Sequence, residues 1–175
     1  MPHYAITAIG SDRPGIVAGL TEALRDVGCN LEDVSSTILR GHFTMMFVVD
    51  APGGDAGAIR DALRGAADPM DVTVTVRDVE AGAPDRPEAT HTLTVYGADK
   101  PGIVAGVARL LAERSVNITN LSCRVVGEEA PVYAMMAEVE VPATEEAGAL
   151  ADALEEHARG LEVDVSIRPI EVETL

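Results

Sequence analysis

The sequence has few aromatic and few basic side chains. Among its 175 residues it has no tryptophan, three tyrosines and two phenylalanines. Proteins that bind single-stranded nucleic acid stack bases on aromatic rings, so this shortage disfavours such a platform. Lys100 is the only lysine, and 13 basic residues face 29 acidic ones, giving a formal net charge of −16. That charge repels a phosphate backbone, so we expect no direct nucleic-acid partner.

Signals of membrane insertion and of catalysis are absent too. No apolar run approaches the roughly 18 residues that span a bilayer, and the N-terminus has no basic leader region. There is no Gly-Lys-Ser/Thr phosphate loop and no G-x-G-x-x-G fingerprint. The histidines do not have metal-ligand spacing, so we expect surface or turn residues at His3, His42, His91 and His157. We therefore expect a cytoplasmic, non-enzymatic protein with no catalytic residue, membrane partner, metal or cofactor.

Cysteine is scarce as well. Cys29 and Cys123 are too few for a disulfide framework, and we expect both to be buried thiols. The hydrophobic fraction of 47% is nevertheless ample for a packed core, which must be built from aliphatic side chains and methionine. The chain is expected to fold.

A long internal repeat organises the sequence. Residues 10–19, GSDRPGIVAG, return as residues 97–106, GADKPGIVAG. The match continues beyond this motif, since Leu24, Asn30 and Ser35 recur as Leu111, Asn117 and Ser122. Such an extent indicates duplication of a domain. We predict a first domain at residues 1–78, a proline-containing linker at 79–90 and a second domain at 91–175, with extra turn residues inserted at 127–131.

Each copy has the alternating periodicities of a small α/β domain. An extended run and a helical run come first, two extended runs meet at a glycine turn, and a second helical run and a final extended run follow. The apolar positions that define these runs in the first copy are Ile6 and Ala8; Ile16, Leu20, Leu24 and Val27; Ile59, Leu63 and Ala66; and Val72, Val74 and Val76. Pro14 is expected in the first helical turn, where its missing N–H has no cost. The order βαββαβ predicts an α+β, ferredoxin-like fold, a four-stranded antiparallel sheet with both helices on one face.

The repeated loop between the first strand and the first helix has the chemistry of an amino-acid site. A helix N-terminus offers free N–H groups and a positive dipole end to a carboxylate. Gly15 and Gly102 have no Cβ, so a ligand can approach the backbone there. Asp12 and Asp99 can receive an ammonium group. The recurring asparagines at the start of the next strand, Asn30 and Asn117, add an amide donor and acceptor.

These polar residues also have a purely structural interpretation. Aspartate is a common helix cap, which would account for Asp12 and Asp99 without a ligand. Asparagine often shapes turns, which would account for Asn30 and Asn117. Both positions recur together in both copies, and this favours a site, although a turn inherited by duplication would recur as well. Both interpretations stay open on the sequence.

The segments DRPGIVAGLTEALRDVGCNLEDVSS and DKPGIVAGVARLLAERSVNITNLSC resemble ACT domains, and the two-copy layout is similar to that of the glycine cleavage system transcriptional repressor family. In that family amino acids typically bind between paired ACT domains, where the strand-to-helix loop of one faces the asparagine-bearing strand of the other. The resemblance implies one site from Asp12, Arg13, Pro14, Gly15 and Ile16 with Asn117, and a second from Asp99, Lys100, Pro101, Gly102 and Ile103 with Asn30. Serine-binding ACT domains of phosphoglycerate dehydrogenase have a histidine and an asparagine where this sequence has Gly10 or Gly97 and Asp12 or Asp99, so the resemblance does not imply serine specificity.

The expected function is that of a regulatory protein without catalysis. A small amino acid such as glycine or serine would bind between paired ACT domains and modulate a regulatory protein partner, in transcriptional control of amino-acid metabolism. Exposed sheet edges favour a homodimer. Two alternatives need no small ligand: a constitutive protein-interaction subunit whose motifs are only structural caps, and a detached regulatory subunit of a metabolic enzyme.

Overall fold

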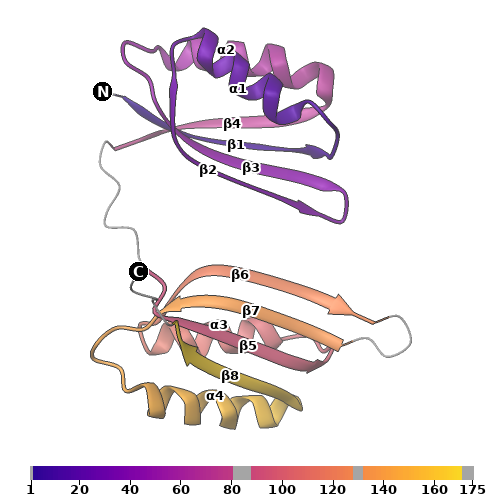
Figure 1. Cartoon of the computed structure of the whole chain (residues 1–175), viewed down its shortest axis with the longest axis vertical. Helices are drawn as coiled ribbons and strands as arrows, with labels where there is room; N and C mark the ends of the chain where they lie inside the picture. Colours follow the sequence, from indigo (N-terminus) through magenta and orange to yellow (C-terminus); the bar gives the residue numbers. More distant parts are fainter. Residues whose placement is uncertain (1, 81–87, 128–131, 171–175) are drawn as a thin grey trace, which may run out of the picture. The chain divides into compact units, whose positions relative to one another are not determined.

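The computed structural model describes residues 2–80, 88–127 and 132–170 (Figure 1). The chain divides into two compact units, Met1–Pro84 and Asp85–Leu175. Val79, which the sequence places in the linker, belongs to the last strand of the first unit. The linker residues 81–87 and the inserted residues 128–131 lie outside the described residues.

Both units have the predicted βαββαβ order. In the first unit the elements are β1 His3–Ser11, α1 Ile16–Asp26, β2 Asn30–Leu39, β3 His42–Asp50, α2 Ala56–Ala67, the 3-10 turn η1 Asp68–Met70, and β4 Val72–Val79. In the second they are β5 His91–Ala98, α3 Ile103–Glu113, β6 Asn117–Val126, β7 Val132–Glu140, α4 Ala147–Leu161 and β8 Val163–Pro169. The sheets are antiparallel, in the orders β2-β3-β1-β4 and β6-β7-β5-β8, and the helices of each unit lie on one face of its sheet (Figure 1). The ferredoxin-like prediction is confirmed.

The core of each unit follows from strand alternation and helical spacing. In β1, Tyr4, Ile6 and Ala8 are buried and the residues between them face away from the helices, because side chains of a strand alternate between faces. Helix α1 buries Ile16, Leu20 and Leu24, one residue per turn, and α3 does the same with Ile103, Val107 and Leu111. The cores contain aliphatic side chains and methionine, as the composition predicts.

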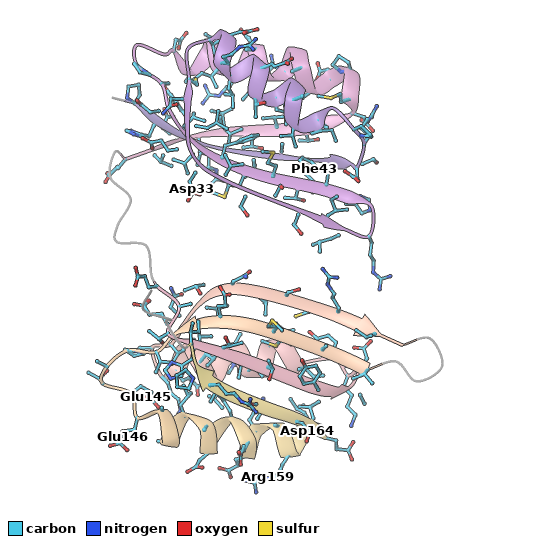
Figure 2. The ribbon with its side chains drawn as sticks, in the orientation of Figure 1. Asp33, Phe43, Glu145, Glu146, Arg159 and Asp164 are labelled. Atoms are coloured by element: carbon cyan, nitrogen blue, oxygen red, sulfur yellow. The ribbon has the colours of Figure 1, made fainter. Side chains whose placement is uncertain are left out.

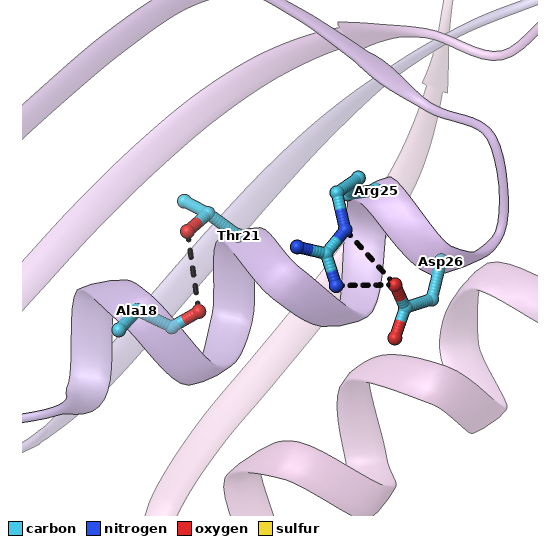
Figure 3. A network of polar contacts seen from close by, with 4 residues as sticks. All are labelled: Ala18, Thr21, Arg25 and Asp26. Atoms are coloured by element: carbon cyan, nitrogen blue, oxygen red, sulfur yellow. Dashed lines mark hydrogen bonds and ion pairs between the residues drawn. The ribbon is translucent and has the colours of Figure 1, made fainter.

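The solvent side of α1 is held by local contacts. The Thr21 hydroxyl lies 3.2 Å from the Ala18 carbonyl, and Nε and a terminal nitrogen of Arg25 donate to one carboxylate oxygen of Asp26 at 3.0 and 2.7 Å (Figure 3). The Asp26 contact raises the pKa of the Arg25 guanidinium. These contacts leave the opposite side of the helix free to pack on the sheet.

Three expectations from the sequence need correction. Cys29 is buried as expected, but Cys123 is exposed because it lies on the edge strand β6, beyond the cover of the helices. Pro14 precedes the helix cap and lies outside the first helical turn, since α1 begins at Ile16 after the cap residue Gly15. His157, expected at the surface or in a turn, lies in helix α4 and is only partly exposed, with its Nε2 buried beside Gly106 of α3.

No helix among the residues that the structure describes combines the length and the apolar composition needed to cross a membrane.

Candidate functional site

The repeated loops end in glycine caps that leave a helix N-terminus open. Gly15 and Gly102 both have φ of 98°, a left-handed conformation in which any side chain would be strained. Nothing lies within 4 Å of the place where a Cβ would be at either glycine. The first helical hydrogen bonds, from Gly19 N to Gly15 O at 2.9 Å and from Gly106 N to Gly102 O at 2.8 Å, leave the earlier N–H groups without a helical partner. Each loop therefore presents free donors to an anion at an accessible position.

Asp12 and Asp99 are not helix caps. The cap residues are Gly15 and Gly102, and in the described part of the chain no side-chain hydrogen bond caps either helix. Asp12 instead fixes the loop through its main chain, whose N–H donates to the Gly41 carbonyl at 2.9 Å. Both aspartates are exposed. Capping therefore does not explain why an aspartate stands at this position twice.

The basic residues of the loops bind back to their own domains. The Arg13 guanidinium donates to the Met70 carbonyl, and the Lys100 ammonium forms an ion pair with the carboxylate of Glu162. Lys100 lowers the pKa of that carboxylate through the hydrogen bond and its charge. Both contacts reach the turn that leads into the last strand of the domain. Arg13 and Lys100 thus position the loop, and their charged groups contact the turn before the last strand.

The isoleucines and prolines of the motif have main-chain and packing roles. Ile16 and Ile103 are each only 1% exposed, so their side chains are core residues and only their N–H groups can meet a ligand. Pro14 and Pro101 are exposed and stand just before the cap glycines, where they restrict the loop backbone.

Within one domain, the asparagine and the loop lie at opposite ends of the sheet. Asn30 pairs with Asp50, whereas Leu39 at the far end of β2 pairs with His42, next to Gly41, which holds the loop. Nine strand steps separate the two ends, about 30 Å at the usual rise per residue. Asn117 pairs with Glu140 in the same way. The structure therefore brings neither Asn30 to Asp12 nor Asn117 to Asp99 within a domain.

Each asparagine has an acidic neighbour that sequence reasoning missed. Asp50 and Glu140 lie directly across the strand pair from Asn30 and Asn117. One Asp50 oxygen, Oδ1, is buried and has no hydrogen-bond partner among the described residues. Burial, and then the charge of Asp50, raise the pKa of the nearby Cys29 thiol. The available signal was an acidic residue that ends the third strand in both copies, after Val49 and Val139.

Close strand packing explains why glycine precedes each loop. A Cβ on Gly10 would lie 2.9 Å from both the Asp71 carbonyl and Val72 Cγ2, and one on Gly97 would lie 2.7 Å from Val163 Cγ1. No side chain fits at either position. The histidine of serine-binding ACT domains therefore has no room here, for a reason that lies in the packing of the last strand against the first.

The two loops have different side-chain neighbours. Phe43 of β3 pairs with Gly10 and is a core residue (Figure 2), whereas Tyr133 of β7 pairs with Gly97 and is only half-buried. Burial, a hydrogen bond with the Cys123 thiol, and the charges of Cys123 and Asp99 raise the pKa of Tyr133 to about 12. The second loop therefore has a phenol and a thiol beside it, and the first has a hydrocarbon ring.

Within the described part of the chain, no three His, Cys, Asp or Glu side chains come together in a way that could hold a metal ion.

Comparison with known families accounts for both domains. The ACT domain family matches residues 3–77 and again residues 91–158. The chain belongs to this family and consists of two tandem ACT domains. Membership indicates a regulatory role of the amino-acid-binding kind.

Individual relatives match one domain or both. A UPF0237 protein of Methanopyrus kandleri is 40% identical over 79 residues, covering 44% of this chain and 88% of the relative. The glycine cleavage system transcriptional repressor of Escherichia coli is 28% identical over 123 residues, 70% of this chain and 65% of the repressor. The crystal structure of a putative glycine cleavage system transcriptional repressor superposes with a TM-score of 0.76 at 20% identity, over 98% of both chains. That structure confirms the fold.

Proposed function

We propose that this protein is a non-catalytic regulator that binds a small amino acid, such as glycine or serine, at its glycine-capped loops. The observation that carries the proposal is the pair of open helix N-termini, each beside an exposed aspartate that does not serve as a cap. The N–H groups suit the α-carboxylate, and the aspartate suits the α-ammonium group. An α-amino acid supplies both charges at once.

The asparagine side chains complete the proposed sites from a second ACT domain. The distance between Asn30 and Asp12 in one sheet excludes a site built within one domain. In the pairing that the resemblance to ACT domains implies, the loop Asp12–Ile16 would act with Asn117, and the loop Asp99–Ile103 with Asn30. The neighbouring acids, Asp50 and Glu140, would favour the ammonium end of the ligand near each asparagine.

The amino acid can regulate the chain if its binding and the binding of a regulatory protein depend on the same conformational equilibrium. An amino acid that changes the affinity of the chain for a regulatory protein must have its own affinity changed by the same factor. Similarity to the repressor of E. coli supports a role in transcriptional control. The net charge of −16 favours control through a protein partner over direct binding to DNA.

A thermal-shift screen against each of the twenty amino acids tests the proposal. A ligand at 100 times its dissociation constant stabilises the native protein by about 2.7 kcal/mol, which raises the melting temperature measurably. One or two amino acids with a clear shift would establish binding. The absence of a shift with every amino acid would support the constitutive interaction subunit instead.

Titration calorimetry on variants then tests how each site is assembled. Asp12→Asn and Asn117→Ala should weaken the same site, and Asp99→Asn and Asn30→Ala the other. Asp26→Asn is the matched control, because Asp26 is an exposed aspartate on α1 that binds only its neighbour Arg25 among the contacts shown (Figure 3). Double variants distinguish the two ways of pairing. Asp12→Asn with Asn117→Ala should leave one site intact, whereas Asp12→Asn with Asn30→Ala should damage both. The reverse result would contradict the assembly from two domains.

A further inference from the structure

A groove of about 570 Å³ runs between helix α2 and the outer edge of strand β4 in the first domain. Its floor is the strand segment Val72–Val76. Its charged residues are Arg60, Arg64, Asp68 and Asp71. None of its lining residues belongs to the loop Asp12–Ile16, and Asn30 is not among them.

The strand edge in this groove is unprotected. β4 is the last strand in the order β2-β3-β1-β4, so one side of its backbone has no partner strand among the described residues. Its first five residues are Val-Thr-Val-Thr-Val, without charge, proline or bulge, and its charged residues Arg77 and Asp78 lie beyond the groove. Proteins normally protect such edges with these devices, because an open edge accepts another strand.

The other edge strands, which all lie within the described residues, have such protection. β2 and β6 both contain an irregularity in register, between Leu31 and Asp33 and between Ile118 and Asn120. β8 has Asp164 in its second position (Figure 2) and ends at Pro169, which has no N–H to donate. β4 is therefore the edge best suited to pairing.

The charges beside the edge form a pattern that is complementary to the same pattern on a second copy turned by 180°. Arg60, Arg64 and Asp68 recur every four residues and so form one stripe on the helix and the turn after it. The chain reverses through η1 into β4, so Asp68 and Asp71 lie near the start of β4 and Arg60 lies farther along it. Arg64, in the middle, is bound to Asp61 at 3.3 Å. The stripe is acidic at one end and basic at the other.

We propose that this groove is an interface with a second copy of the chain, in which the β4 segments Val72–Val76 pair antiparallel about a twofold axis at Val74. The axis brings Val72 of one copy opposite Val76 of the other and keeps their side chains on the same face. It also brings Arg60 of each copy to Asp68 and Asp71 of the other. Such a contact is isologous, so both copies use the same surface. The two sheets of four strands become one sheet of eight.

The second domain does not have this surface. At the position of Arg60 it has Ala151, and at the position of Arg64 it has Glu155. Arg159 stands where the first domain has Asp68, and it is bound within α4 to the Glu155 carbonyl at 3.4 Å (Figure 2). Self-association through β4 does not require amino-acid binding, and the two proposals can fail separately.

Sedimentation equilibrium of the full chain with two charge-reversal variants tests the interface. Arg60→Asp places acid against acid at both symmetric contacts, and Asp68→Arg places base against base. Each variant alone should dimerise at least about tenfold more weakly than the wild type, because attraction at two ion pairs becomes repulsion. An equimolar mixture of the two variants should recover wild-type affinity, since the heterodimer restores opposite charges at both contacts. Recovery in the mixture cannot arise from misfolded variants.

Arg159→Asp is the matched control, at the equivalent place in the second domain, and it should dimerise like the wild type. A typical dimer of this kind has a dissociation constant of about 1 μM. A wild-type chain that stays monomeric at about 100 μM would overturn the proposal. So would variants that dimerise like the wild type, because the dimer would then use another surface. Variants that weaken the dimer but do not recover on mixing would likewise contradict the twofold pairing.

Discussion

The two domains have the same loop backbone and different surroundings. In both, a glycine with φ of 98° caps the first helix, and a basic side chain holds the loop to the turn before the last strand. Beside the loops, the first domain has the ring of Phe43 and the second has Tyr133 with Cys123. The common features are those that backbone geometry requires. The differences are in side chains that packing leaves free to vary, and these are where the two domains can acquire separate roles.

The largest difference between the domains is expected in thiol reactivity. Cys123 is exposed on an edge strand, whereas Cys29 is buried and its pKa is raised by burial. The thiolate is the reactive form, so Cys123 should react with a water-soluble thiol reagent about a hundredfold faster than Cys29 in the native protein. Mass spectrometry of the labelled protein over time measures both rates. Similar rates in the native state, and not only in denaturant, would show that Cys29 is accessible.

Alanine at Gly10 or Gly97 tests a feature that the domains have in common. The added Cβ meets backbone atoms in both cases, Asp71 O at 2.9 Å and Val163 Cα at 2.9 Å, and backbone cannot move aside as a side chain can. Each substitution should lower the free energy of unfolding by about 2 kcal/mol. Urea denaturation gives the values. Gly65→Ala, at a helical position with nothing within 4 Å, is the control that should not destabilise.

Alanine at the equivalent helical glycines, Gly19 and Gly106, should affect the stability of the two domains differently. A Cβ on Gly106 would overlap the His157 ring, whose Nε2 is already buried without a hydrogen-bond partner among the described residues. A Cβ on Gly19 meets only the flexible end of Met70 at 3.1 Å. Gly106→Ala should therefore destabilise by about 1 kcal/mol, and Gly19→Ala should be neutral. If His157→Ala does not relieve the cost of Gly106→Ala, the ring is not its cause.

The smallest effect concerns the pH dependence of the two loop contacts. The Glu162 pKa is lowered in the folded state, so its ion pair with Lys100 stabilises above the ordinary pKa of 4.5 and is lost as pH falls through the lower folded value. Lys100→Met should slightly lower the melting temperature at pH 7, and the difference from wild type should disappear in acid. Arg13→Met removes a contact with a carbonyl, which does not titrate, so its effect should persist at both pH values. A matching pH response in both variants would contradict these assignments.

The fold could be predicted from the sequence because its signals are local and repeated. Alternation around Ile6, helical spacing from Ile16 and the recurrence of the loop motif each specify one element, and each appears twice. The aliphatic core follows in the same way. Exposure at the sheet edge did not follow: Cys123 was expected to be buried and is exposed, because it lies on the edge strand β6. Position in the strand order decides this, and strand order is not a local property.

The features of the candidate site likewise fall into those that local sequence determined and those that tertiary contacts determined. The sequence by itself determined where each loop begins and ends and which residue types it offers, because glycine and proline restrict the backbone locally. Only the tertiary structure decided what those residues do. It shows that Asp12 is no cap, that Arg13 and Lys100 bind their own domains, and that Asn30 lies at the other end of the sheet from Asp12. These facts depend on contacts between distant segments, and such contacts exist only once the strands have paired.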